Sequence, residues 1–174
     1  DCRKIVSGGM NGEIRIWRIS PYQQKMEASL KEHRARVWNI VINSRNDRAF
    51  SASSDGSCIE WDISNYTRVA CLFETTMFKQ LVYHPDESQI LTTGTDKKIT
   101  YWDVIDSNEI RSVDGSYDGE INTIAICKSG EYFITAGEDK QITIWDYDLA
   151  TPKWKGIGHS NGINRIAIAP NQEF

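Results

Sequence analysis

The sequence predicts an all-β fold: a segment of a β-propeller built from repeated four-stranded blades. The first observation is a fixed interval between tryptophans, because Trp17, Trp61, Trp102 and Trp145 lie 44, 41 and 43 residues apart. The second is that a hydroxyl residue precedes each of them by ten positions. A repeat of about 40 to 45 residues is typical of propeller blades and outweighs local propensities.

The repeated set consists of a hydroxyl, a carboxylate and an indole in constant register. The three complete copies are Ser51, Asp55 and Trp61; Thr92, Asp96 and Trp102; and Thr135, Asp139 and Trp145. A weaker copy opens the chain, with Ser7, Asn11 in place of the carboxylate, and Trp17.

Residues 1–32 are predicted to form the last three strands of a blade, near Lys4–Ser7, Glu13–Ile19 and Met26–Leu30. The dipeptide Asn11-Gly12 separates the first two strands, and both residue types tolerate the positive φ of tight hairpin turns. The N-terminal segment therefore reads as an incomplete blade.

Three complete blades are predicted to follow, at 33–73, 74–114 and 115–157, with the first strand of a further blade in 158–174. Their innermost strands share apolar columns, as expected for strands packed on both faces. These columns are Val37, Phe78, Ile121 and Ile163; Ile40, Leu81, Ile124 and Ile166; and Ile42, Tyr83, Ile126 and Ile168.

The remaining strands of each blade follow from turn residues and alternation. Second strands are expected at Ala49–Ser53, Gln89–Thr93 and Tyr132–Ala136, and third strands at Cys58–Ile63, Ile99–Val104 and Ile142–Tyr147. Outer strands of mixed polarity are expected at Arg68–Phe73, Glu109–Val113 and Lys153–Ile157.

Two arrangements of these blades stay open. The terminal strand completes a four-bladed ring with residues 1–32, or the chain is a slice of a larger propeller, since propellers typically have 4–8 blades. The sequence favours the slice, because Phe174 follows an inner strand without a polar capping element.

Composition narrows the function. Of the 174 residues 40% are apolar, the net charge is −4, and both signs are spread along the chain. This argues against nucleic-acid binding, which needs clustered basic residues. No apolar run is long enough for a membrane span, and the N-terminus lacks a signal peptide, so we expect a soluble cytoplasmic protein. The cysteines lack metal-site spacing, so neither metal nor cofactor is expected; they are Cys2, Cys58, Cys71 and Cys127.

One blade contains the residue types of a hydrolase triad, in His33, Ser51 and Asp55. The alternative is a structural network in which His33 bonds Asp55, while Ser51 bonds both His33 and the indole of Trp61. The other blades keep the hydroxyl and the carboxylate but have Glu74 and Ser116 near the histidine position. A set that tolerates this loss is predicted to be structural, and no catalytic residue is expected.

Candidate partner contacts lie in the loops that enter the inner strands, since recognition concentrates on loops held by a rigid scaffold. Arg34, Arg36 and Trp38 stand together at one blade entrance and have the composition of an interface hot spot. Packing of Trp38 between blades is the alternative. The columns equivalent to Trp38 hold Lys79, Asn122 and Asn164.

The whole chain resembles the WD40 repeat family through its Trp-Asp repeats. It is further similar to the cilia- and flagella-associated WD-repeat proteins of the axonemal doublet lumen, in residues 82–87, 94–102, 158–166 and 169–171. That resemblance implies part of a second propeller and a scaffold role with tubulin and axonemal proteins as partners. The alternative is a cytosolic adaptor that recognises a peptide at the channel mouth. Asn11 and Arg18, where the repeat has Asp, depart from the pattern in the first blade.

Overall fold

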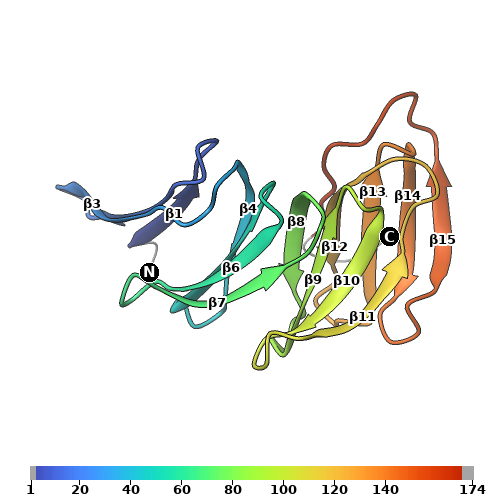
Figure 1. The fold of residues 1–174 in the computed structure, drawn as a ribbon. Helices are drawn as coiled ribbons and strands as arrows, with labels where there is room; N and C mark the ends of the chain where they lie inside the picture. Colours follow the sequence, from blue (N-terminus) through green and yellow to red (C-terminus); the bar gives the residue numbers. More distant parts are fainter. Residues whose placement is uncertain (1–2, 170–174) are drawn as a thin grey trace. The chain divides into compact units, whose positions relative to one another are not determined.

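The computed structural model describes residues 3–169, and every regular element in that range is a β-strand (Figure 1). The chain divides into two compact units, Asp1–Phe78 and Lys79–Phe174. Within the described range there is no helix of the length and apolarity that crossing a membrane requires. The predicted all-β, partial-propeller fold is confirmed.

The N-terminal unit contains two antiparallel sheets in simple up-and-down order. The three-stranded sheet has the order β1-β2-β3, with β1 at Lys4–Gly8, β2 at Ile14–Ile19 and β3 at Gln24–Leu30. The four-stranded sheet consists of β4 at Val37–Ile42, β5 at Arg48–Ser53, β6 at Ser57–Asp62 and β7 at Thr67–Phe73.

The C-terminal unit repeats this plan in two further four-stranded sheets, of which β8 takes its first residue from the preceding unit. One sheet comprises β8 at Phe78–Tyr83, β9 at Gln89–Gly94, β10 at Lys98–Asp103 and β11 at Glu109–Asp114. The other comprises β12 at Ile121–Ile126, β13 at Tyr132–Gly137, β14 at Gln141–Asp146 and β15 at Pro152–Ile157.

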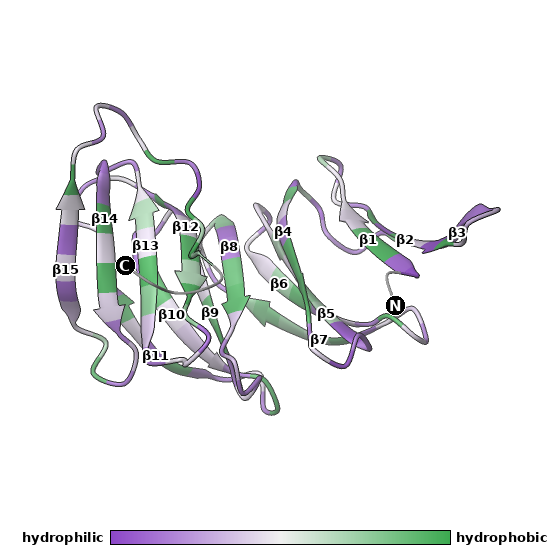
Figure 2. Ribbon diagram, turned by 180° about the vertical axis from the view of Figure 1, so that it is seen from behind, coloured by the Kyte–Doolittle hydropathy of each residue, from purple (hydrophilic) through white to green (hydrophobic). Residues whose placement is uncertain are grey.

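Each unit has a hydrophobic core formed between its sheets. In the N-terminal unit the buried cluster consists of Ile14, Ile16, Val37, Ala49, Ile59, Trp61 and Ile63. In the C-terminal unit it consists of Leu91, Ile99, Tyr101, Ile121, Ile124, Phe133, Trp145 and Tyr147. Figure 2 shows hydrophobic residues along β12 and β13. Strand β15 is more hydrophilic, and all its residues are exposed. The apolar inner strands and the outer strands of mixed polarity thus follow the pattern that the sequence predicts.

The tight turn after each repeated Asp or Asn has a residue in the left-handed region. Gly12 and Gly56 occupy it in the first two sheets, with φ of 82° and 84°. Lys97 and Lys140 occupy it in the other two, with φ of 65° and 63°. Glycine adopts this region without steric cost, whereas a side chain makes it less favourable. The turn geometry is therefore common to all four sheets although the residue type is not.

All four sheets also have a register shift immediately before the repeated tryptophan. The pairing of the third strand with the outer strand shifts at Trp17, Trp61, Trp102 and Trp145. Such a bulge bends the strand and re-aims the side chain beside it. Sequence periodicity predicts the strands but not this irregularity.

The strand positions agree with the sequence predictions to within about two residues, and the structure differs at the C-terminal end. Residues 158–169 contain no strand, although the first strand of a further blade is predicted there. A strand is defined by its ladder, and no described strand pairs with this segment. The segment nevertheless contacts the end of β13, because the N–H of Ile163 donates to the carbonyl of Gly137 at 2.8 Å. Cys2 and residues 170–174 lie outside the described range.

Candidate functional site

The structure brings His33, Ser51, Asp55 and Trp61 into one buried hydrogen-bonded network. The loop before β4 carries His33, whereas Ser51 lies on β5 and Trp61 on β6. The indole N–H of Trp61 donates to Ser51 Oγ at 2.8 Å. Ser51 Oγ also lies 2.6 Å from His33 Nε2, and His33 Nδ1 lies 3.1 Å from Asp55 Oδ2. The network therefore connects the entry loop to the second and third strands of the sheet.

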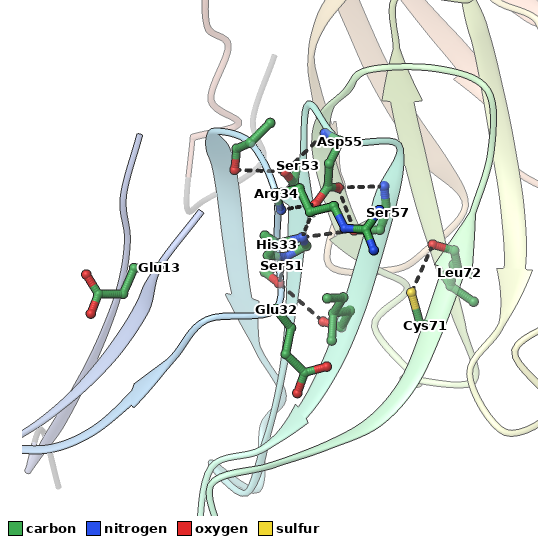
Figure 3. A network of polar contacts seen from close by, with 12 residues as sticks. Glu13, Glu32, His33, Arg34, Ser51, Ser53, Asp55, Ser57, Cys71 and Leu72 are labelled. Atoms are coloured by element: carbon green, nitrogen blue, oxygen red, sulfur yellow. Dashed lines mark hydrogen bonds and ion pairs between the residues drawn. The ribbon is translucent and has the colours of Figure 1, made fainter. Parts of the chain in front are cut away.

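Ser57 is an additional member of this network that the sequence analysis misses. Its hydroxyl donates to Asp55 Oδ1 at 2.6 Å and lies 2.9 Å from His33 Nδ1. The backbone N–H groups of Ser57 and Arg34 donate to the same carboxylate, at 2.9 and 2.7 Å. Figure 3 shows His33, Asp55 and Ser57 turned toward one another. An Asp followed two residues later by Ser is an Asx-turn signal, and it would have pointed to Ser57.

The surroundings keep His33 neutral and Asp55 ionised. Burial lowers the pKa of His33 below its usual value, although the adjacent carboxylate of Asp55 acts in the opposite direction. Burial would raise the pKa of Asp55, but the hydrogen bonds from Ser57 and from the Arg34 N–H outweigh it, and the pKa is lowered. A neutral ring with its proton on Nδ1 donates toward Asp55, and its Nε2 accepts the hydrogen of Ser51.

The side chains are connected in the order Ser–His–Asp of a hydrolase triad, but a substrate has no access to the serine. A nucleophilic serine must reach a substrate carbonyl, and its oxygen must be free to attack. Ser51 is 0% exposed, and its oxygen already accepts the indole N–H of Trp61. The arrangement satisfies buried polar groups, which would otherwise destabilise the fold. Among residues 3–169 no group of three or more His, Cys, Asp or Glu side chains is placed to hold a metal ion.

The other sheets retain the indole–hydroxyl bond without the histidine. The indole N–H donates to the hydroxyl in each: Trp17 to Ser7 at 3.0 Å, Trp102 to Thr92 at 2.9 Å and Trp145 to Thr135 at 2.8 Å. The carboxylates of Asp96 and Asp139 each accept the backbone N–H two residues later, at 3.2 Å. In the last sheet the hydroxyl of Ser116 donates to Asp139 Oδ2 at 3.2 Å.

In the first sheet Asn11 Oδ1 accepts the N–H of Glu13 at 3.2 Å, as the repeated Asp accepts the N–H two residues later in the other sheets. The carboxylate of Glu13 forms contacts of its own. It accepts hydrogen bonds from Ser29 on β3, from Arg15 Nη2 at 2.8 Å and from Asn11 Nδ2 at 3.3 Å. The hydrogen bonds from Ser29 and Arg15 lower the pKa of Glu13 to about 2. Arg18, the other departure from the repeat, forms an ion pair with Glu27 at 2.5 Å. The sequence does not predict the contacts of Glu13, because its partner Ser29 is sixteen residues away.

The residues predicted as partner contacts in the N-terminal unit, Arg34, Arg36 and Trp38, lie at the start of β4 and in the loop before it. The guanidinium of Arg36 stacks on the ring of Trp38, with Cζ 3.8 Å from the ring centroid. The indole N–H of Trp38 donates to Ser54 Oγ at 2.6 Å, and Trp38 remains 37% exposed. Arg34 is exposed beside them. The side chain of Trp38 is thus held in place while part of it remains open to solvent.

Two of the three equivalent residues of the C-terminal unit form polar contacts. Lys79 forms an ion pair with Glu120, with Nζ 3.1 Å from Oε2. Asn122 donates to Glu138 Oε1 at 2.7 Å and to the carbonyl of Ile163 at 3.1 Å. Asn164 is exposed. Their role as partner contacts stays a prediction.

Comparison with known proteins agrees with the repeat pattern. The family profile described as "WD domain, G-beta repeat" matches residues 24–62, 75–103 and 107–146. The chain is similar to "Cilia- and flagella-associated protein 52" of Sus scrofa, with 42% identity over all 174 residues, and of Homo sapiens, with 41%. The protein of that name from Chlamydomonas reinhardtii is 44% identical over 91% of this chain. The matched regions make up 28%, 28% and 26% of those three proteins, so the chain spans under a third of their length.

The profile matches cover more than half of the chain, and the indole–hydroxyl bond recurs in every sheet of the described structure. The sequence resemblance is therefore confirmed, and the chain belongs to the WD40 repeat family.

Proposed function

We propose that this protein is a non-catalytic scaffold of the cilium or flagellum that binds other proteins of the axoneme. The observation that carries the proposal is the identity of 41–44% to cilia- and flagella-associated proteins from mammals and an alga, over 91–100% of the chain. WD40 repeat domains mediate protein–protein interactions, and tubulin and other axonemal proteins are the partners we infer.

The buried network supports a role without catalysis. The only Ser, His and Asp side chains that meet in triad order among residues 3–169 are those of Ser51, His33 and Asp55. These side chains are hydrogen-bonded to one another, and Ser51 also accepts the indole N–H of Trp61. Breaking these hydrogen bonds would leave buried donors unpaired. Function is thereby left to exposed side chains.

Localisation of the complete protein tests this proposal. A fluorescently tagged protein expressed in a ciliated cell is expected along the axoneme and should remain there after detergent removes the membrane and the soluble proteins. Loss of the protein should weaken the doublet microtubules, measured as fraying by electron microscopy. A diffuse, detergent-soluble signal together with unaltered axonemes after its loss would contradict the proposal.

A second candidate is an adaptor that recognises a peptide at the channel mouth. The Arg36–Trp38 stack favours it, because an exposed aromatic ring paired with Arg is typical of an interface hot spot. A scaffold is expected to use several faces, whereas an adaptor depends on this one surface.

Substitution of two exposed aromatic residues, Trp38 and Tyr22, separates the candidates. Trp38→Ala should abolish partner capture from ciliary extracts if the protein is an adaptor and weaken it only partly if it is a scaffold. Tyr22→Ala, in the β2–β3 turn, removes another exposed ring and serves as the matched control. Equal binding by both variants and the wild type would exclude the Arg36–Trp38 surface from either role.

A further inference from the structure

A pocket recurs at equivalent places of the repeat. In the C-terminal unit it has a volume of about 280 Å³ and is bordered by the end of β11, the loop that follows it, β14 and β15. Pockets of about 260 and 200 Å³ lie at the equivalent places of the β4–β7 and β1–β3 sheets. The residue two positions before the repeated tryptophan lines each pocket, as Thr143, Ile59 and Arg15. The pockets therefore differ in the chemistry of their walls.

Charge sets the C-terminal pocket apart. The two pockets of the N-terminal unit have equal numbers of acidic and basic side chains, and each contains an ion pair. These pairs are Arg68–Glu32 at 2.7 Å and Arg15–Glu13 at 2.8 Å. The C-terminal pocket has three carboxylates and one ammonium, those of Asp114, Asp118, Asp139 and Lys155. None of the three carboxylates forms an ion pair with any of residues 3–169, so the pocket has an excess of negative charge.

Thr143 is the second distinguishing feature of this pocket, which it lines although it is only 4% exposed. In the preceding sheet the equivalent Thr100 Oγ1 lies 3.2 Å from Ser112 Oγ on the neighbouring strand. The residue opposite Thr143 is Lys155 instead. The hydroxyl of Thr143 forms no hydrogen bond with any of residues 3–169 and is not sealed inside the sheet, so it is open to the pocket. Because polar groups this buried are normally paired, the free hydroxyl indicates a ligand that supplies the missing hydrogen bond.

The remaining walls suit a cation with an apolar stem. Trp145 and Pro152 line the pocket with apolar surface. The ring of Tyr117, which is 94% exposed, also lines it. Lys155 Nζ lies 5.6 Å from the centroid of that ring, so the ring already attracts one cation.

We propose that this pocket binds an arginine side chain of a partner protein. Its guanidinium donates to the unpaired carboxylates and to Thr143 Oγ1, while its stem contacts Trp145 and Pro152. Arginine fits better than lysine, because its planar fork of five N–H donors serves several acceptors at once and is more weakly hydrated. The pocket includes neither Arg36 nor Trp38. The inference does not depend on the ciliary location, and its failure would leave the localisation test unaffected.

The test measures binding of N-acetylarginine methylamide to the complete protein. The readout is the ¹⁹F resonance of Tyr117 in protein labelled with fluorotyrosine, assigned by its absence from Tyr117→Phe. The expected result is a saturable shift with the arginine probe and none with the citrulline analogue, which has nearly the same shape but no charge. Equal shifts from the two probes, tighter binding of the lysine analogue, or no saturation by the arginine probe would overturn the proposal.

The threonine makes the assignment specific. Thr143→Val removes the hydroxyl, nearly preserves the shape of the side chain, and should weaken binding of the arginine probe roughly tenfold. Thr100→Val is the matched control, because this threonine has the same place in the preceding repeat but does not line the pocket, and it should leave the affinity unchanged. Unchanged affinity of Thr143→Val, or an equal loss in both variants, contradicts the proposal.

The exposed carboxylate of Asp114 provides a second variant should Thr143→Val not fold. Asp114→Asn keeps the shape of the side chain and removes its charge, so we expect binding of the arginine probe to weaken roughly two- to fivefold. Unchanged affinity of Asp114→Asn would then contradict the proposal.

Discussion

Ser51 Oγ lies 2.6 Å from His33 Nε2, at a place where both side chains are buried. In a hydrolase this contact prepares an attack on substrate. Here the serine oxygen accepts the indole N–H of Trp61, so the contact ties the entry loop to strands β5 and β6. The stability of this sheet therefore depends on a chain of four side chains, each satisfying the next.

Removal of the carboxylate tests that chain. Asp55→Ala leaves His33, Ser57 and the Arg34 N–H without their acceptor, and we expect it to lower the free energy of unfolding by about 1–3 kcal/mol. Urea denaturation of the purified protein measures the change. Asp106→Ala, in an exposed turn, is the control and should stay within about 0.5 kcal/mol of the wild type. An unchanged midpoint for Asp55→Ala would refute the structural role of the network.

The neutral state of His33 predicts a pH dependence. Its pKa is lowered in the folded state, so below about pH 6.5 the unfolded chain binds a proton that the folded protein does not. The unfolding free energy should therefore fall as the pH decreases below that value, and this component should be absent from His33→Gln. Denaturant midpoints of both proteins across this range give the comparison. Parallel profiles for the two proteins would show that His33 does not contribute.

The hydroxyls of the repeat are expected to contribute unequally. Ser51→Ala removes the partner of both a buried imidazole and a buried indole, and we expect a loss of about 1–3 kcal/mol. Ser7→Ala removes the acceptor of Trp17 alone, in a half-buried position, and should cost less than about 1 kcal/mol. Thermal unfolding of the two variants gives the order, and a greater loss for Ser7→Ala would contradict it.

A close backbone approach explains why Gly137 is a glycine. A Cβ at this position would overlap the carbonyl oxygen of Glu120, which cannot move away as a flexible side chain can. Gly137→Ala is expected to destabilise the protein by roughly 1–3 kcal/mol. Gly156→Ala on β15 is the matched control, since its Cβ would come no closer than 3.6 Å to Ile142. Equal unfolding midpoints for the two variants would disprove the steric argument.

Much of the fold could be predicted from the sequence because each blade contains its own pairing partners. The interval between tryptophans gives the period, and the apolar columns give the inner strands, so strand positions agree closely. The segment 158–169 is the exception: its sequence resembles an inner strand, but strand formation depends on a partner that no described residue supplies. Pattern alone does not carry that information.

The site was predictable only in part. The spacing of Ser51, Asp55 and Trp61 predicts which side chains meet, because hairpin geometry fixes their register. The exposure of Trp38 could not be predicted in this way, because the position of its ring depends on stacking with Arg36 and on the hydrogen bond to Ser54. Neither contact has a sequence signature.

The bond from each indole to its hydroxyl spans only ten residues of chain. Contacts that are this local form early, because little loop entropy opposes them. During translation, each hairpin is thus able to form its indole–hydroxyl hydrogen bond before the next repeat leaves the ribosome. The hydrophobic cores, by contrast, combine residues of two sheets, so the packing of a blade is completed only when its neighbour is present.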